Sequence, residues 1–237
     1  MLRDKPVTAI IPARGGSKGI PRKNLLELGG DTLLERTIKF ARAAPSVDRV
    51  IVSTDDPEMY DISKRYDVAA PALRPAEHAG DAAKTEAAVD HLIDQAGISD
   101  GWLLLLQVTS PLRMLKDLGA LVALLEATPD ADAAVSLCRY TGPHPAKMLT
   151  VEEGRIAPFM ERKYTGPRQA LPDVYVLNGA FYLVALNAYL RENTFLPEHT
   201  VPFVMPEERS ANIDTPTDWQ VLQAMIAQGY WPMESYE

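Results

Sequence analysis

Strand-like and helix-like runs alternate along this chain of 237 residues, and the alternation limits the folds open to it. Short apolar runs suited to buried strands are followed by runs with apolar residues at helical spacing. The runs that predict strands are 7–13, 49–53, 102–107, 133–138 and 178–184, and those that predict helices are 32–44, 81–96, 117–127 and 216–228. We therefore expect an α/β fold with a mostly parallel sheet and helices on both of its faces.

Length and composition are those expected of a single domain over residues 1–237. Hydrophobic residues make up 46 % of the chain, which can fill a sizeable core. The formal net charge of −8 argues against a nucleic-acid partner. No apolar run of about 18 residues predicts a membrane span, and the first residues lack a signal-peptide pattern. Cys138 is the single cysteine, so we expect a buried thiol and a protein of the reducing cytoplasm.

The segment 10–24, IIPARGGSKGIPRKN, joins the first predicted strand to a basic, glycine-rich loop. Its glycines are Gly15, Gly16 and Gly19, and its basic residues are Arg14, Lys18, Arg22 and Lys23. Backbone N–H groups of glycines can turn closely toward an anion, and nearby cations offset the charge of that anion. In an acidic chain, such a loop predicts a polyphosphate-binding site.

Two common phosphate-binding motifs do not match this loop. Ser17 rather than glycine precedes Lys18, which excludes a Walker A loop. Gly15 and Gly16 are adjacent, which excludes the GxGxxG pattern of dinucleotide-binding folds. From the pattern alone, a solvated turn remains the alternative.

Polar residues also follow the predicted strand 102–107, where Pro111 stiffens a turn. They are Gln107, Thr109, Ser110 and Arg113. Ligands of parallel sheets bind beyond the carboxyl ends of the strands, so we expect this segment to lie beside the basic loop. Gln107 offers both a donor and an acceptor to a base or sugar. The alternative for Ser110 is capping of the following helix, which is compatible with a place at the site.

Two later segments carry further candidate residues. Arg168 and Gln169 precede a proline-stiffened turn, and Arg168 suits a bidentate clamp on a carboxylate; a surface arginine is the alternative. Asp214 ends a short β-like stretch, where a carboxylate can hold Mg²⁺ on a triphosphate. For Asp214 and Thr215 the alternative is an N-cap of the next helix.

The segment 140–172 differs from the rest of the chain. It contains five prolines and a weakly alternating stretch at 148–156. We interpret it as a small β arm inserted into the sheet fold, which packs on a partner subunit or closes over a ligand. A disordered linker is the alternative, but Phe159, Met160 and Tyr164 favour burial.

Seven motifs together resemble those of a known family. In order, they are IPARGGSKGIPRKN, RPAEHAGDAAKT, LLQVTSPLR, HPAK, PRQALP, NGAFY and SANIDT. Their order and spacing resemble those of the acylneuraminate cytidylyltransferases, or CMP-sialic acid synthetases. The wider group includes enzymes for legionaminic and pseudaminic acids. The resemblance covers nearly the whole chain and implies a Rossmann-like nucleotidyltransferase sheet, a homodimer, and an arm that contributes to dimerisation.

The resemblance also implies a reaction, in which the anomeric hydroxyl of a nonulosonic (nine-carbon sugar) acid attacks the α-phosphate of CTP and diphosphate leaves. It implies Mg²⁺ as the cofactor and a catalytic role for Arg14, Lys18 and Asp214, with the metal on Asp214. The nucleotide-binding residues that it implies are Arg14, Gly15, Gly16, Ser17, Lys18, Asn24, Arg74 and Thr85. The sugar-binding residues that it implies are Gln107, Thr109, Ser110, Lys147, Arg168, Gln169, Asn178 and Tyr182.

Two residues depart from the family's usual pattern. Asn212 stands where an aspartate is usual, so a candidate second metal ligand keeps its oxygen but loses its charge. Val108 replaces a proline, which relaxes the turn that carries Thr109. The alternatives to a nonulosonic acid cytidylyltransferase are a nucleotidyltransferase for another sugar, such as a CMP-Kdo-like enzyme, and a non-catalytic nucleotide-binding homologue. Asn212 is the only sequence feature that favours the non-catalytic homologue.

Overall fold

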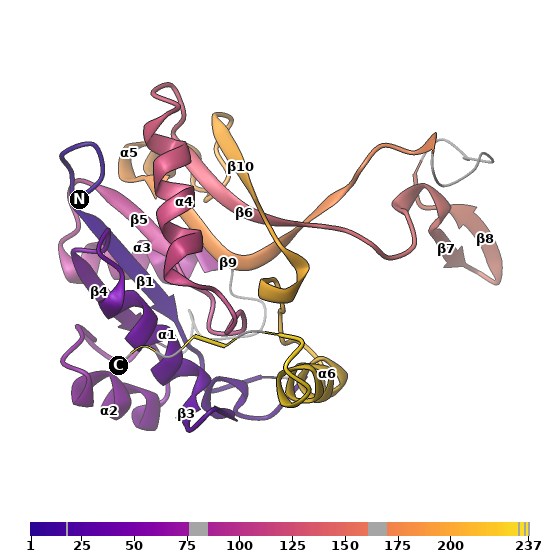
Figure 1. Ribbon diagram of the computed structural model, residues 1–237. Helices are drawn as coiled ribbons and strands as arrows, with labels where there is room; N and C mark the ends of the chain where they lie inside the picture. Colours follow the sequence, from indigo (N-terminus) through magenta and orange to yellow (C-terminus); the bar gives the residue numbers. More distant parts are fainter. Residues whose placement is uncertain (18, 76–84, 161–169, 232, 235, 237) are drawn as a thin grey trace.

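A six-stranded sheet forms the centre of the computed structural model, which describes residues 1–17, 19–75, 85–160, 170–231, 233–234 and 236. The strand order is β10-β6-β9-β5-β1-β4 (Figure 1). The bounds are β1 Val7–Pro12, β4 Arg49–Ser53, β5 Trp102–Leu105, β6 Ala133–Arg139, β9 Tyr175–Ala185 and β10 Thr200–Met205. β1 pairs in parallel with β4 and β5, and β10 with β6, which confirms a mostly parallel sheet.

β9 runs antiparallel to both of its neighbours, β5 and β6. It returns from the segment that leaves the sheet at the end of β6, and a chain that leaves and re-enters at one point gives an antiparallel pair. The apolar run at 178–184 predicts a buried strand but not its direction.

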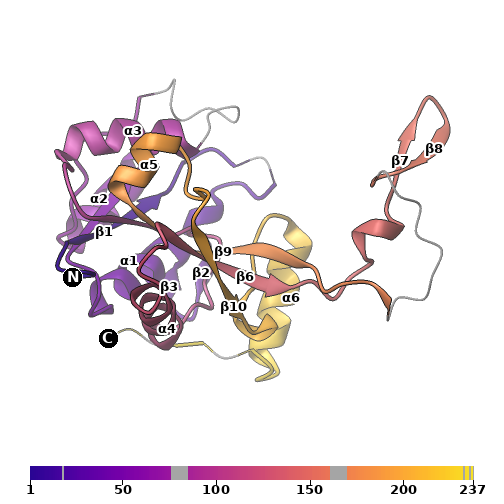
Figure 2. The ribbon, with the colours of Figure 1, turned by 90° about the horizontal axis from the view of Figure 1, so that it is seen from above.

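Helices cover both faces of the sheet, as the alternation predicts (Figure 2). Their bounds are α1 Leu33–Ala43, α2 Pro57–Arg65, α3 Thr85–Ala96, α4 Leu115–Glu126, α5 Leu186–Glu192 and α6 Pro216–Ala227. Successive residues of a strand point to opposite faces. Ile11 of β1 therefore joins a core that includes α1 and α4, while Ile10 joins a second core with α3 and α5. Residues 81–84 of the predicted helix 81–96 lie outside the described part.

Helix starts follow from capping side chains. Thr32 Oγ1 accepts a hydrogen bond from Glu35 N, and a Glu35 carboxylate oxygen accepts one from Thr32 N, so the predicted capping box is confirmed. Asp56 caps α2 next to Pro57, because its side chain accepts hydrogen bonds from Glu58 N and Met59 N. Thr215 caps α6, which confirms the structural alternative for that residue. Gly97 ends α3 with φ +62°.

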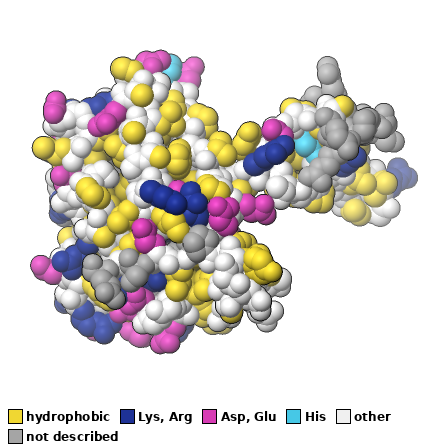
Figure 3. Space-filling model, in the orientation of Figure 1, with side chains coloured by type: hydrophobic (Ala, Val, Ile, Leu, Met, Phe, Trp, Pro, Cys, Tyr) yellow, Lys and Arg dark blue, Asp and Glu magenta, His cyan; other side chains and the backbone are white. Residues whose placement is uncertain are grey.

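The described residues 140–160 and 170–174 lie between β6 and β9 and extend away from the body in both views (Figures 1 and 2). This arm contains the short helix η3 (Pro145–Lys147) and an antiparallel hairpin of β7 (Leu149–Glu152) and β8 (Arg155–Pro158). Its apolar side chains are exposed, with Val151 at 72 % and Ile156 at 71 % (Figure 3). A role in dimerisation stays a prediction.

Smaller elements complete the fold. A two-stranded hairpin, β2 (Glu27–Leu28) and β3 (Asp31–Thr32), precedes α1, and the 3₁₀ helices η1 (Lys23–Leu25) and η5 (Glu207–Arg209) lie in loops. Among the described residues, no helix combines the length and apolar character needed to cross a membrane.

Candidate active site

One pocket lies beyond the carboxyl ends of β1 and β5, where a ligand of such a sheet is expected. Its volume is about 260 Å³. The predicted site residues that line it are Arg14, Gly16, Ser17, Asn24, Arg74, Gln107, Thr109 and Asp214. Residues from four distant parts of the chain therefore meet in one cavity, together with Lys23 and Val108.

The glycine loop is held from both sides. Gly15 N donates to Asp55 Oδ1 at 2.9 Å, in the turn that follows β4. A Cβ on Gly15 would lie 2.9 Å from Asp56 Oδ2, so only glycine lets the loop approach this turn. Asn24 is buried, and its Nδ2 donates to the carbonyl of Arg14 at 3.0 Å. These contacts fix the start of the loop, while Lys18 lies outside the described residues.

The basic residues of this loop point to different places. Lys23 lines the pocket, and its Nζ lies 3.0 Å from Asp214 Oδ1. Arg22 instead pairs with Glu58 at 2.6 Å and so contacts the start of α2. Within the described part, the cations of the loop that line the pocket are thus Arg14 and Lys23.

Arg74 supplies a third cation to the pocket. Its guanidinium is buried, with Nε 3.0 Å from Ser53 Oγ and Nη2 2.5 Å from the Ser53 carbonyl. Burial lowers the pKa of Arg74, the charge of Asp55 opposes that shift, and the charge of Arg14 adds to it. The side chain keeps its charge at neutral pH, because an arginine pKa starts near 12.5. An anionic or carbonyl ligand would relieve the repulsion between these two cations.

Gln107 and Thr109 line the pocket from the segment after β5. Arg113 organises this segment, because its buried guanidinium donates to the carbonyls of Gln107, Ser110 and Ala180. Burial lowers the pKa of Arg113 to about 10; Tyr236 opposes this shift, and the charge of Arg36 adds to it.

Ser110 lies behind the pocket wall. It is 1 % exposed, and its Oγ donates to the carbonyl of Asn178 at 2.9 Å. The N-cap of α4 is Met114, so helix capping by Ser110 is wrong. The hydroxyl instead connects the segment after β5 to β9.

Asp214 reaches the pocket just before α6. Its Oδ2 accepts a hydrogen bond from Asn212 Nδ2 at 2.6 Å. The backbone before it is tied to the segment after β5, since Ile213 N donates to the Thr109 carbonyl at 2.9 Å. A Cβ on Gly19 would collide with the Asp214 carbonyl, so the glycine loop and this segment are in direct contact.

The cytidylyltransferase family model matches residues 8–148, which is more than half of the chain and contains the glycine loop, Arg74 and the segment after β5. The chain belongs to this family.

Named relatives extend this likeness over nearly the whole cytidylyltransferase. A pseudaminic acid cytidylyltransferase of Campylobacter jejuni subsp. jejuni (strain 81-176) is 32 % identical over 88 % of this chain and 91 % of its own. The CMP-N,N'-diacetyllegionaminic acid synthase of Legionella pneumophila is 28 % identical over 93 % and 96 %. A solved CMP:2-keto-3-deoxy-manno-octonic acid synthetase complexed with CTP has the same fold, with a TM-score of 0.68, 18 % identity, and coverage of 94 % of this chain and 99 % of that one.

Several predicted residues lie away from the pocket of this cytidylyltransferase. Asn178 is 2 % exposed, and its side chain is bonded to Ser136 and Ser210. Tyr182 packs against Phe195 in the core with α3 and α5, where burial raises its pKa. Lys147 lies on the arm. Arg168 and Gln169 lie outside the described residues, and so does the side chain of Thr85, although its neighbour Ala88 lines the pocket.

Mg²⁺ fits the donors that this cytidylyltransferase offers. No cluster of three metal-binding side chains occurs in the described parts of the chain. Mg²⁺ in nucleotide sites needs fewer protein ligands, because one or two carboxylates and the phosphates commonly hold it. The Asp214 carboxylate meets that requirement, while the amide nitrogen of Asn212 donates a hydrogen bond to it.

Sequence reasoning missed Asp55 and Lys23 as parts of the site. Asp55 follows the end of the strand 49–53, a position where a carboxylate is a signal for a site residue, and it holds the glycine loop through Gly15 N. The sequence shows Lys23 only as one of the basic residues of the loop and does not indicate which residue it contacts. Its contact with Asp214 joins residues 191 positions apart in the chain, a separation that no local pattern reveals.

Proposed function

We propose that this protein couples CTP to a nonulosonic acid and releases a CMP-sugar and diphosphate. The observation that carries the proposal is the meeting of the glycine loop, Arg74, Gln107 and Asp214 in one pocket. The named relatives, which act on pseudaminic and legionaminic acids, support the same class of acceptor.

The residues that line the pocket support three binding regions, for the triphosphate, the nucleoside and the sugar acid. Arg14, Lys18, Lys23 and the loop backbone would bind the triphosphate, and Arg74 with Asn24 would bind the nucleoside side. Gln107 and Thr109 would hold the sugar acid, so that its anomeric hydroxyl is in line with the α-phosphate. Such transfers need positioning and charge stabilisation more than covalent help from the protein.

Asp214, with Asn212 beside it, would hold Mg²⁺. When bound, Mg²⁺ neutralises the phosphate oxygens and stabilises charge that develops on the leaving diphosphate. Lys23 would then move from the Asp214 carboxylate to a phosphate oxygen, because the cation and the ammonium compete for the same carboxylate.

We also propose a homodimer that works in the cytoplasm, where CTP is available. The exposed apolar residues of β7 and β8 support it, because such side chains are normally buried against a partner. Lys147 lies on the arm, away from the pocket of its own body, so the arm would cover the sugar site of the second copy (Figure 1).

The test is diphosphate release from CTP and Mg²⁺ with a panel of N-acetylneuraminic, legionaminic, pseudaminic and Kdo acids. Release with a nine-carbon acid supports the proposal and identifies the acceptor. Release with Kdo alone would move the assignment to an eight-carbon acid. Tight CTP binding without release across the whole panel favours the non-catalytic alternative, which the loss of charge at Asn212 also favours.

A further inference from the structure

β9 contains a bulge that faces the pocket wall. Residues 178–181 all lie opposite Ser136 alone, since Leu137 pairs with Leu177 and Val135 with Tyr182. Ser136 Oγ fills the gap in the ladder: it donates to Asn178 Oδ1 at 2.6 Å and accepts from Phe181 N at 2.8 Å. Bulges of this kind redirect the residues around them.

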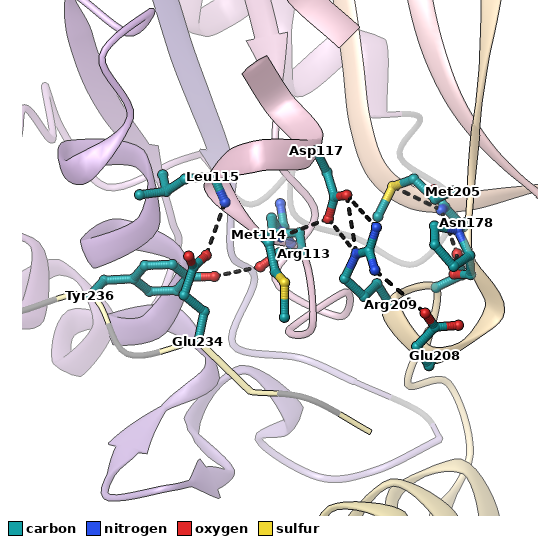
Figure 4. Close-up of polar contacts among 12 residues, drawn as sticks. Arg113, Met114, Leu115, Asp117, Asn178, Met205, Glu208, Arg209, Glu234 and Tyr236 are labelled. Carbon is teal, nitrogen blue, oxygen red and sulfur yellow. Dashed lines mark hydrogen bonds and ion pairs between the residues drawn. The ribbon is translucent and has the colours of Figure 1, made fainter. Parts of the chain in front are cut away.

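The Asn178 side chain is fully used in holding this bulge. Its Oδ1 also accepts from Ala180 N at 3.2 Å, and its Nδ2 donates to Ser210 Oγ at 3.0 Å, with Met205 Sδ beside it (Figure 4). With both ends of a buried amide bonded inside the protein, Asn178 has no group left for a sugar.

Gly179 is the residue that the bulge brings against the site. Its φ is +74°, and a Cβ there would collide with Gln107 Oε1 and lie 2.7 Å from Ser110 Oγ. The carboxamide of Gln107 therefore rests on the bare backbone of Gly179. On its other side, Gln107 lines the pocket.

Little else fixes the Gln107 carboxamide. Arg113 holds the Gln107 carbonyl, but the side-chain amide has no hydrogen-bond partner among the residues that the structure describes. Its direction is thus set by contact with Gly179, which leaves its donor and acceptor available to a ligand.

We propose that Gly179 is a positioning residue for the acceptor site. Because Gly179 has no side chain, the Gln107 carboxamide can lie against the bulge in one orientation. In that orientation Gln107 sets the affinity for an acceptor that carries hydroxyl and carboxylate groups. The link to the acceptor rests on the proposed function, whereas the contact between the two residues does not.

A double-mutant cycle tests the coupling, with Gly179→Ala, Gln107→Ala and the double variant. In the native background, Gly179→Ala should raise KM for the sugar acid about tenfold while KM for CTP changes less than about twofold. In the Gln107→Ala background, the same change should raise KM for the sugar acid much less, because the carboxamide that it displaces is gone and only the contact with Ser110 Oγ remains. Equal effects in both backgrounds would overturn the proposal.

Alanine at Gly179 also strains the backbone, because its φ is positive, and a second glycine with positive φ serves as the control for that strain. Gly229 has φ +71°, and a Cβ there meets nothing within 4 Å. Gly229→Ala should therefore lower the melting temperature without changing either KM. An equal rise in KM for the acceptor in Gly229→Ala would show that backbone strain, not the Gln107 contact, is responsible.

A measurement that does not depend on catalysis tests the contact between Gln107 and Gly179 separately from the proposed reaction. In the unmodified protein, NMR should show nuclear Overhauser effects between the Gln107 side chain and the Gly179 α-protons. Their presence supports the contact even if no acceptor of the panel reacts or the variants do not fold. Their absence overturns the proposal whatever the reaction.

Discussion

Asn212 donates a hydrogen bond of 2.6 Å from its side-chain amide to Asp214 Oδ2. With Lys23 at 3.0 Å from Oδ1, both oxygens of the carboxylate are engaged. A divalent cation that binds Asp214 therefore competes with the Lys23 charge and approaches the N–H group of Asn212. An aspartate at position 212 would add a negative charge at this point.

Asn212→Asp should strengthen cation binding. A second carboxylate adds one negative charge that attracts the cation near the surface. We therefore expect the affinity for Mn²⁺ in the presence of CTP to rise about tenfold. Electron paramagnetic resonance of free Mn²⁺ measures this directly. Asn193→Asp is the matched control, because it adds the same charge at the end of α5; an equal gain there would show a general charge effect.

Arg14→Ala and Asp214→Ala should abolish most turnover while the fold is kept. Loss of one group that stabilises developing charge typically lowers kcat about 100- to 1,000-fold. Diphosphate release and circular dichroism measure the two properties. Arg22→Ala is the control, because Arg22 pairs with the exposed Glu58 instead of lining the pocket. Full activity of Arg14→Ala would contradict the proposed site.

The arm supplies a prediction about assembly. Ile156→Asp places a charge on the exposed apolar hairpin, and we expect it to convert a dimer to a monomer in sedimentation experiments. Leu190→Asp, on α5 and also exposed, should leave the mass unchanged. A native protein that is already monomeric and active would refute the proposed arm contact.

Tyr236 closes the space behind Arg113. Its hydroxyl donates to the Arg113 carbonyl (Figure 4), and its ring packs edge-on against Phe40, with 5.4 Å between ring centroids. Tyr236→Phe keeps the ring and removes the hydrogen bond, so unfolding in urea should become easier by about 1 kcal/mol. Tyr230→Phe, at an exposed position, should change nothing measurable.

Acid should weaken the segment that carries Asp214. Burial raises the pKa of Asp218, but hydrogen bonds from Thr215 N and Asp214 N outweigh it, and the pKa is lowered overall. A lowered pKa in the folded state gives stability that is present above the ordinary aspartate pKa and is lost as pH falls through the folded value. Urea unfolding from pH 6 to pH 3 should therefore depend less on pH in Asp218→Asn.

Sequence patterns predicted the buried strands of the sheet well, because apolar runs mark them without help from the rest of the chain. They missed β10, whose sequence TVPFVM contains Pro202 and lies half-exposed at the sheet edge. They also missed α5, since it begins at Leu186 directly after β9 and has only seven residues.

For the site, the position of the loops after the strands predicted that the basic loop and the segment after β5 meet, and residues from both line the pocket. The places of Asn178 and Tyr182 depend on the bulge in β9, which inserts residues that simple alternation does not count. No local pattern in NGAFY reveals it. The same holds for Lys23 and Asp214, whose contact exists only after the chain has folded.

The arm leaves the sheet at the end of β6 and returns at β9, and these two strands are neighbours. Both ends of the arm lie at the same end of the β6–β9 pair. The arm can therefore change in length without changing the register of any other strand. The nucleotide loop and the arm can therefore diverge separately in evolution. Related chains can therefore keep the pocket beyond β1 and β5 while the length and surface of the arm change.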